Sequence, residues 1–308
     1  MNQITFQKFD FSKYSDRLVV TDKKIAKLYG ISGDNVYLLP QGERAKSFRN
    51  VNALCRWFLA KKLAVGDTVV AVGGGSVGDT VGFATGIYKR GVNVLHVPTT
   101  VIAQIDSSIG GKTAINLGNV KNAVGSYHFG DTLIDTDFLK TLDSTQLLSG
   151  YGELIKYRML DEQVRQVDND GKGSFDDIVR ACVNYKQRLC ETDPYCKKER
   201  NKLNFGHTVG HALELKYKIP HGVAVANGIY YETKLAAKLG LCSKDYADKW
   251  TYEIERGFPR IYPLNKKIVS LMLQDKKNAD GKVCFVLPDV FDETYLTIKE
   301  VEELLLND

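Results

Sequence analysis

Three of the five histidines in this 308-residue chain fall close together, at His207, His211 and His221. His207 and His211 are four positions apart, so they share one face if the segment is helical. Glu214 continues that face, and His221 follows Pro220, just past the expected helix end. Zinc accepts imidazole nitrogen and carboxylate oxygen, and a catalytic zinc keeps one position open. Spacing alone nominates His207 and His211 as a ligand pair, with a solvated polar helix face as the alternative.

A second pair that could do chemistry is Glu153 and Lys156, in the segment GELIKY (152–157). Residues three apart on a helix face the same side. A buried carboxylate at this place would suit a metal, and the lysine would suit an anion. The alternative is an exposed ion pair, which adds little stability. Spacing alone favours that alternative.

A glycine-rich stretch at residues 69–83 has the G-x-G-x-x-G spacing of dinucleotide sites at Gly73, Gly75 and Gly78. It follows a strand-like run and precedes a helix-like one, the context in which a pyrophosphate binds at a helix N-terminus. No acidic residue stands about twenty positions further on to hold a ribose, so Asp22 and Glu43 are the candidates for that task. A tight turn without a ligand is the alternative.

Polar side chains crowd the next segment, residues 98–129, where a lysine directly follows two glycines. Lysine beside permissive backbone is common in anion sites, and a plain surface loop is the alternative. The polar row consists of Thr99, Thr100, Asp106, Ser107, Lys112, Thr113, Asn116, Lys121 and Asn122.

Strand-like and helix-like runs alternate in the first half of the chain, and the second half has mainly helical spacing. Runs that are apolar on both faces are typical of buried parallel strands, so we expect a doubly wound α/β domain followed by a mostly helical one. Strands are expected at 17–22, 35–40, 68–75, 93–100 and 282–289, and helices at 47–63, 143–160, 174–189, 204–218, 223–240 and 297–306.

The composition favours a soluble globular protein, with 44% hydrophobic and 26% charged residues. The net charge of +5 is mild, so we expect no nucleic-acid partner. No apolar run has the roughly 18 residues of a membrane helix, and the N-terminus has no signal-peptide core. The six cysteines form no C-x-x-C pair and are expected to be reduced thiols. We therefore expect a cytoplasmic protein with no membrane partner.

Many short motifs together resemble the sugar-phosphate cyclase family, and within it the 3-dehydroquinate synthases. They occur in the family's order and cover nearly the whole chain. They are QGERAKS (41–47), GGGSVGDTVGF (73–83), RGVNVLHVPTT (90–100), AQIDSSIGGKTAIN (103–116), KNAVGSY (121–127), SGYGELIKY (149–157), LNFGHTVGHALE (203–214), HGVAVANGI (221–229) and DKKNADGKVCFVLP (275–288).

The resemblance implies a Rossmann-like NAD-binding α/β domain at residues 1–145 and a mostly helical metal- and substrate-binding domain at 146–308, in a homodimer. It assigns metal binding to Glu153, His207 and His221, and places His211 near the substrate as a proton-transfer or hydrogen-bonding group. It assigns NAD to Asp22, Glu43, Lys46, Gly74, Gly75, Asp79, Thr99, Thr100, Lys121 and Thr141. It assigns catalysis and substrate binding to Asp106, Lys112, Asn122, Lys156, Lys186, Arg200, Asn204, His211 and Lys276 or Lys277, with Arg90 reaching the neighbouring subunit's phosphate site.

The chemistry implied by the resemblance starts from a phosphorylated sugar acid, 3-deoxy-arabino-heptulosonate 7-phosphate. Lysine, arginine and asparagine donors suit its carboxylate and phosphate. Bound NAD+ would oxidise a ring hydroxyl, while zinc or cobalt stabilised the oxygen charge. Phosphate would then leave by elimination, the hydride would return, and ring opening with aldol closure would give 3-dehydroquinate.

Three alternatives remain at this point. One is another cyclase of the family, such as a 2-deoxy-scyllo-inosose or 2-epi-5-epi-valiolone synthase. The second is a polyol dehydrogenase that consumes NAD, and the third is a binding protein without activity. The chain also departs from the family's pattern. A segment usually found between Lys156 and Lys186 is missing, Val223 replaces an acidic or polar residue, Lys24 replaces a frequent asparagine, and Gly152 replaces a frequent alanine, which we expect to matter little.

Overall fold

A computed structural model describes residues 3–118, 120–168, 172–273, 278, 280–288 and 291–306 of the chain. The chain divides into two compact units, each described by itself below. Unit 1 comprises Met1–Leu142 and Gly173–Tyr195, and unit 2 comprises Asp143–Lys172 and Cys196–Asp308. The predicted boundary at 145/146 lies three residues beyond the first segment of unit 1, and residues 173–195 belong to unit 1 rather than to the second domain.

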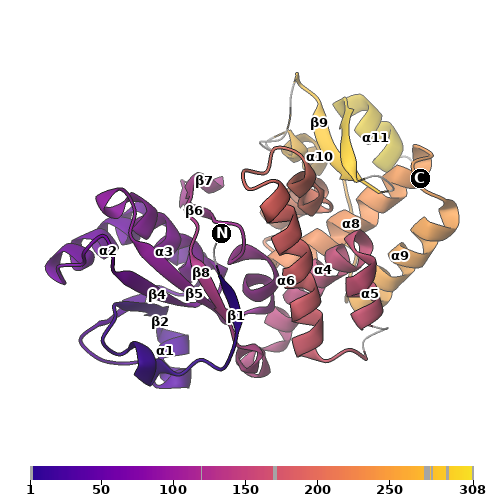
Figure 1. The fold of residues 1–308 in the computed structure, drawn as a ribbon. Coiled ribbons are helices and arrows are strands. Elements are labelled where there is room, and N and C mark those ends of the chain that lie inside the picture. Colours follow the sequence, from indigo (N-terminus) through magenta and orange to yellow (C-terminus); the bar gives the residue numbers. More distant parts are fainter. Residues whose placement is uncertain are drawn as a thin grey trace. The chain divides into compact units, whose positions relative to one another are not determined.

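Unit 1 contains a six-stranded sheet with the order β1-β8-β5-β4-β2-β3, and every pairing is parallel (Figure 1). The prediction of a doubly wound α/β domain is therefore confirmed. Strands β2, β3, β4 and β5 lie within the predicted runs, whereas β1 and β8 were not predicted. The strands are β1 (Ile4–Phe6), β2 (Val19–Asp22), β3 (Val36–Leu39), β4 (Thr68–Gly73), β5 (Asn93–Pro98) and β8 (Asp131–Ile134).

Both faces of this sheet are buried, which explains its apolar strands. Val69 and Ala71 of β4 belong to a core cluster with residues of α2 (Phe48–Ala60) and α3 (Gly75–Ile87). Val70 and Val72 alternate with them and belong to a second cluster with Ile25 of helix α1 (Lys23–Tyr29). Successive strand residues point to opposite faces, so helices cover both sides of the sheet.

Three further elements complete the part of unit 1 that concerns the site. An antiparallel hairpin is formed by β6 (Lys112–Leu117) and β7 (Val120–Tyr127). A π-helical turn, η4 (Ala103–Ser107), precedes the hairpin, and helix α6 (Phe175–Thr192) packs against this turn. Short 3₁₀ turns are η1 (Phe11–Tyr14), η2 (Gly42–Ala45), η3 (Tyr88–Arg90) and η5 (Thr136–Thr141).

Unit 2 is mostly helical, as predicted, and α8 lies at its centre, packed against α4, α7 and α9. Its core includes Ile155, Phe205, Ile229 and Trp250, all almost fully buried. The elements are α4 (Ser144–Leu160), α5 (Glu162–Asp168), η7 (Glu199–Asn204), α7 (His207–Tyr217), α8 (His221–Lys238), α9 (Lys244–Gly257), α10 (Lys266–Met272), β9 (Val283–Leu287), β10 (Asp292–Leu296) and α11 (Ile298–Leu306).

All six cysteines lie in described residues, and none of them forms a disulfide. Among the described residues, no helix has the length and apolar character needed to cross a membrane.

Candidate functional site

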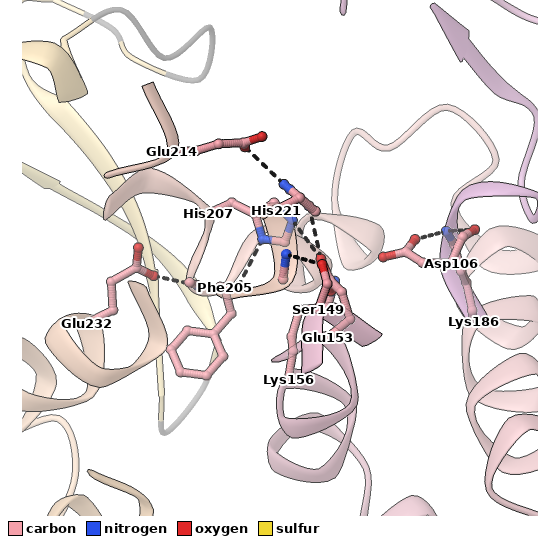
Figure 2. Close-up of polar contacts among 12 residues, drawn as sticks. Asp106, Ser149, Glu153, Lys156, Lys186, Phe205, His207, Glu214, His221 and Glu232 are labelled. Atoms are coloured by element: carbon pink, nitrogen blue, oxygen red, sulfur yellow. Dashed lines mark hydrogen bonds and ion pairs between the residues drawn. The ribbon is translucent and has the colours of Figure 1, made fainter. Parts of the chain in front are cut away.

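Three potential metal ligands from three helices of unit 2 converge on one point (Figure 2). They are Glu153 of α4, His207 at the start of α7 and His221 at the start of α8. One ligand atom from each lies within 4.8 Å of the other two. Glu153 Oε1 is 3.1 Å from His221 Nε2 and 3.5 Å from His207 Nε2. Tetrahedral zinc with ligands at about 2.0–2.1 Å holds neighbouring donors about 3.3 Å apart, so the three donors suit such an ion.

Both imidazoles are oriented by a partner on the opposite ring nitrogen. His207 Nδ1 lies 3.1 Å from the Phe205 carbonyl oxygen, and His221 Nδ1 lies 3.1 Å from Glu214 Oε2. A carbonyl oxygen can only accept, so His207 donates its Nδ1–H and presents the lone pair of Nε2 toward Glu153. Partners of this kind fix the ring orientation and raise the basicity of metal-binding histidines.

The two histidines differ in charge when no metal is bound. Burial, followed by the nearby Lys156 charge, lowers the pKa of His207 well below its ordinary value, so its ring is neutral. Burial also acts to lower the pKa of His221, but hydrogen bonds to the Glu153 and Glu214 carboxylates outweigh it and raise the pKa to about 10. The positive charge of the site is therefore a proton on His221, close to the position that a metal cation would take.

Glu153 and Lys156 form an ion pair of 2.7 Å, and each side chain is only 1% exposed. The interpretation as an exposed surface pair, which spacing favoured, is therefore wrong. The Lys156 ammonium pairs with Oε2 of Glu153, and Oε1 of the same carboxylate faces the two histidines (Figure 2).

The backbones of α4 and α8 touch beside the ligands. A Cβ atom added at Gly152 would lie 1.9 Å from the Gly222 carbonyl oxygen, and one added at Gly222 would lie 1.7 Å from the Ser149 carbonyl oxygen. Ser149 Oγ also accepts a hydrogen bond of 3.0 Å from the Gly222 N–H. The expectation that Gly152 matters little is therefore wrong in this chain.

The first turn of α7 is held by Glu232 from α8. This fully buried carboxylate accepts the N–H groups of Gly206 at 2.6 Å and Val209 at 3.1 Å. Figure 2 shows Glu232 on the side of Phe205 away from Glu153. Gly206 occupies the N-cap with a φ of +80° and has no side chain that could cap the helix. Glu232 therefore does the capping from a distance, next to His207, and nothing in the local spacing had indicated it.

His211 lies beside the three-ligand group without belonging to it. Its ring centroid is 5.3 Å from that of His207 and 6.1 Å from that of His221. Arg200, which is 2% exposed, and Asn204 lie on the turn η7 that leads into α7. The group of three potential ligands thus contains His207 and His221 but not His211, and the substrate-facing role of His211 stays a prediction.

In unit 1, Lys186 of α6 reaches the turn η4. Its ammonium contacts both the carboxylate and the carbonyl oxygen of Asp106 (Figure 2). Lys186 is 3% exposed, so the contact is largely shielded from water. Two residues predicted to meet the substrate thus come together from segments far apart in the chain.

A second polar group in unit 1 surrounds Lys46, which caps η2. Its ammonium contacts the carboxylate of Asp79 on α3 and the amide oxygen of Asn122 on β7. Burial raises the pKa of Asp79, while the Lys46 charge acts to lower it. Asn116, which was not assigned a role, donates a hydrogen bond of 2.8 Å to Glu43 on η2.

The glycine-rich turn leads directly from β4 into α3. Gly74 is the N-cap and Gly75 the first residue of that helix, which leaves its first backbone N–H groups without a capping side chain. A Cβ at Gly74 would lie 3.1 Å from Thr100 Cγ2, so the turn passes close to the residues that follow β5. A bare helix N-terminus with permissive backbone fits a pyrophosphate, and acidic residues at earlier strand ends fit ribose hydroxyls.

The other predicted residues lie at several places. Asp22 caps α1, where its Oδ1 accepts the N–H groups of Lys24 and Ile25. Thr141 ends η5 and bonds Tyr29 through its hydroxyl at 2.7 Å. Within the described ranges we see no hydrogen bond that joins Arg90 or Lys112 to another predicted site residue. Thr99 follows β5, Arg90 ends η3, Lys112 begins β6, Lys121 lies in β7, and Lys276 and Lys277 lie outside the described residues.

Family models cover both units of the chain. The model of the 3-dehydroquinate synthase N-terminal domain matches residues 36–149, and the model of the C-terminal domain matches residues 150–278. A 3-dehydroquinate synthase from Roseobacter denitrificans is 35% identical, with 91% of this chain and 84% of that protein covered. Another, from Alkaliphilus metalliredigens, is 36% identical, with 88% and 83% covered. The chain belongs to the 3-dehydroquinate synthase family.

Solved structures of related cyclases share the family's fold. A 2-epi-5-epi-valiolone synthase from Streptomyces hygroscopicus subsp. jinggangensis 5008, with NAD+ and Zn2+ bound, is 25% identical with a TM-score of 0.85 over 99% of this chain and 96% of that one. A 2-deoxy-scyllo-inosose synthase is 24% identical with a TM-score of 0.83, and it covers 98% and 95% of the two chains. These structures confirm the predicted fold class, and membership of the family confirms the resemblance.

Proposed function

We propose that this chain is a 3-dehydroquinate synthase that uses catalytic NAD+ and a divalent metal, zinc or cobalt. The substrate is 3-deoxy-arabino-heptulosonate 7-phosphate, and the products are 3-dehydroquinate and phosphate. The observation that carries the proposal is the convergence of Glu153, His207 and His221 with the buried Lys156, in a chain that matches both family models.

The metal and the cofactor supply a Lewis acid and a reversible hydride acceptor when they are bound. Glu153, His207 and His221 hold the metal in this proposal. Gly74, Gly75 and the start of α3 take the pyrophosphate of NAD+. Asp22 and Glu43 take its ribose hydroxyls, with Lys46, Asp79, Thr99, Thr100, Lys121 and Thr141 as further contacts.

The residues of the chain bind and orient the substrate. Cationic and amide donors suit a molecule that carries both a carboxylate and a phosphate. Lys156 is held against Glu153 at 2.7 Å, so its ammonium has a fixed position from which it meets an anion. His211 moves or shares a proton near the substrate, beside the metal ligands but not among them. The remaining contacts are proposed for Arg90, Asp106, Lys112, Asn122, Lys186, Arg200, Asn204 and Lys276.

The direct test supplies the phosphorylated sugar acid with zinc and a small amount of NAD+. We expect inorganic phosphate and dehydroquinate to form over many turnovers per NAD+, with no lasting NADH absorbance. Phosphate release from sedoheptulose 7-phosphate or glucose 6-phosphate, but not from the sugar acid, would support another cyclase instead. Steady NADH accumulation with simple polyols would identify a dehydrogenase.

Chelation tests whether the metal is catalytic. Structural zinc sites contribute folding energy, so their proteins unfold on metal removal. We expect the chelated protein to lose turnover while its circular dichroism stays unchanged, and turnover to return with zinc. We also propose that the protein is a homodimer in the cytoplasm. Sedimentation of the purified protein measures its oligomeric state.

A further inference from the structure

Asn116 at the end of strand β6 makes three hydrogen bonds that link separate segments of unit 1. Its Nδ2 donates to Glu43 Oε2 at 2.8 Å, and its Oδ1 accepts the Asn122 N–H at 2.9 Å. Its own N–H donates to the Lys46 carbonyl oxygen at 3.1 Å. The side chain therefore uses both its donor and its acceptor, and each meets a residue with a proposed ligand.

The bond to Asn122 supports an unusual backbone. Asn122 has a φ of +52°, in the left-handed region that asparagine adopts more readily than most other residues with a side chain. The hairpin register shifts between Ile115 and Leu117, directly at Asn116. The Asn116 side chain thus bridges from this irregularity to the left-handed residue Asn122 on β7. The Asn122 amide oxygen then contacts the Lys46 ammonium.

The bond to Glu43 fixes an otherwise exposed carboxylate. Glu43 lies on the short turn η2, and its second oxygen is 3.5 Å from the Ser76 hydroxyl on α3. A glutamate on an exposed turn has several rotamers available, and ordering it costs conformational entropy. The 2.8 Å bond from Asn116 selects one of these rotamers before any ligand arrives.

We propose that Asn116 is a positioning residue that sets the cofactor-binding carboxylate of Glu43 and the substrate-binding amide of Asn122 in fixed relation to each other. The inference rests on the proposed function, because that proposal gives Glu43 to NAD and Asn122 to the substrate. Asn116 itself touches neither ligand and acts through its two partners.

Two substitutions distinguish the two hydrogen bonds of the Asn116 side chain, one to Glu43 and one to Asn122. Asn116→Asp keeps an oxygen that accepts the Asn122 N–H but places a carboxylate against Glu43. Asn116→Ala removes both bonds. Asn52→Asp, at an exposed asparagine of α2, is the matched control for the charge change. The equilibrium Kd for NAD+ is measured by fluorescence on the zinc-loaded protein, and the KM for the sugar acid is measured at saturating NAD+.

We expect Asn116→Asp to raise the Kd for NAD+ about tenfold, as the loss of a hydrogen bond to a charged group predicts, with the KM near that of the unchanged protein. Asn116→Ala should raise both constants, and Asn52→Asp neither. Unaltered Kd and KM in Asn116→Ala, or an equal rise of both in Asn116→Asp, would overturn the inference. Absence of turnover in the unchanged protein would instead overturn the proposed function, and the NAD+ measurement would still report on Glu43.

Discussion

Glu153 and Lys156 form a 2.7 Å ion pair in which neither side chain is more than 1% exposed. The other carboxylate oxygen of Glu153 faces the Nε2 atoms of His207 and His221 at 3.5 and 3.1 Å. A buried charge is stable only when it is paired and hydrogen-bonded. Glu153 therefore has a charged partner on one oxygen, Lys156, and two imidazoles near the other, and its ionised form is the one that would bind a metal.

Replacing Glu153 by Gln should remove the metal. The amide keeps the shape of the side chain but loses its negative charge. Removing a residue that only hydrogen-bonds to a metal ligand already lowers metal affinity about 10- to 100-fold. We expect a decrease of more than about 100-fold, measured as zinc content after dialysis against a weak chelator. Lys156 would be left as an uncompensated buried charge, so the thermal midpoint should also fall. Glu162→Gln on α5 is the control, and a variant that retained one zinc per chain would contradict the assignment.

Replacing His211 by Ala should spare the metal and damage turnover. His211 lies beside the ligand group, 5.3 Å from the His207 ring centroid, but is not part of it. A group that transfers a proton contributes about 10²- to 10⁴-fold to rate, so kcat should fall within that range. His207→Ala is the matched comparison and should lose zinc as well. If zinc is lost from the His211 variant too, the ligand pair nominated by helix spacing is the right one.

Replacing Glu232 by Gln should loosen the first turn of α7. Glu232 is fully buried and accepts two backbone N–H groups, at 2.6 and 3.1 Å. The amide of Gln offers one acceptor and turns a donor toward the other N–H, which leaves buried polar groups unsatisfied. We expect the free energy of unfolding to fall by about 2 kcal/mol and zinc affinity to fall about tenfold. Glu255→Gln on the exposed side of α9 should change neither, and unchanged zinc affinity would limit Glu232 to a role in stability.

The buried His96 of β5 should make unit 1 less stable in mild acid. Burial, aided by the His128 charge, lowers the pKa of His96 to about 4, while the unfolded chain keeps about 6.5. Because the unfolded state binds the proton first, the stabilising effect is complete above about pH 6.5 and decreases as the pH falls toward about 4.

The full effect of this titration is about 3 kcal/mol, from roughly 1.4 kcal/mol per pH unit. Urea unfolding at pH 7.5 and pH 5.0 measures it, with His96→Asn as the variant that cannot titrate. The difference in unfolding free energy between the two pH values should be smaller for the variant. Equal differences for both proteins would show that His96 titrates normally in the folded state.

The elements that sequence periodicity predicts well are those with one clear apolar pattern. Helix α2 and strand β4 are examples: the buried residues of α2 recur at helical spacing, and those of β4 form the continuous buried run that is typical of a central parallel strand. The hairpin β6–β7 was not predicted, because most of β7 is exposed and its polar residues give no alternation. Strand β1 is only three residues long and half-buried throughout, which is too short for a periodic signal. Strand β8 is as long as the predicted strands β2 and β3, so its length does not explain why it was not predicted.

In the candidate site, the spacing of residues along the sequence does not predict which side chains are buried or which helices meet. Spacing correctly placed Glu153 and Lys156 on one helix face, but it could not reveal that α8 buries that face. Spacing likewise linked His207 to His211, whereas the structure brings His221 to His207 from the start of the next helix. Tertiary packing decides both points, and the spacing of residues within one helix carries no information about it.

The contact between Gly152 and Gly222 has a consequence for the choice of ion. Each glycine is the direct neighbour of a proposed ligand, Glu153 or His221, and the missing Cβ atoms let the two backbones touch. An alanine at position 152 would force α8 away from α4 and carry His221 with it. The distances between the three ligand atoms would then change, and with them the ionic radius that the site favours. The cause would be a methyl group that touches no metal.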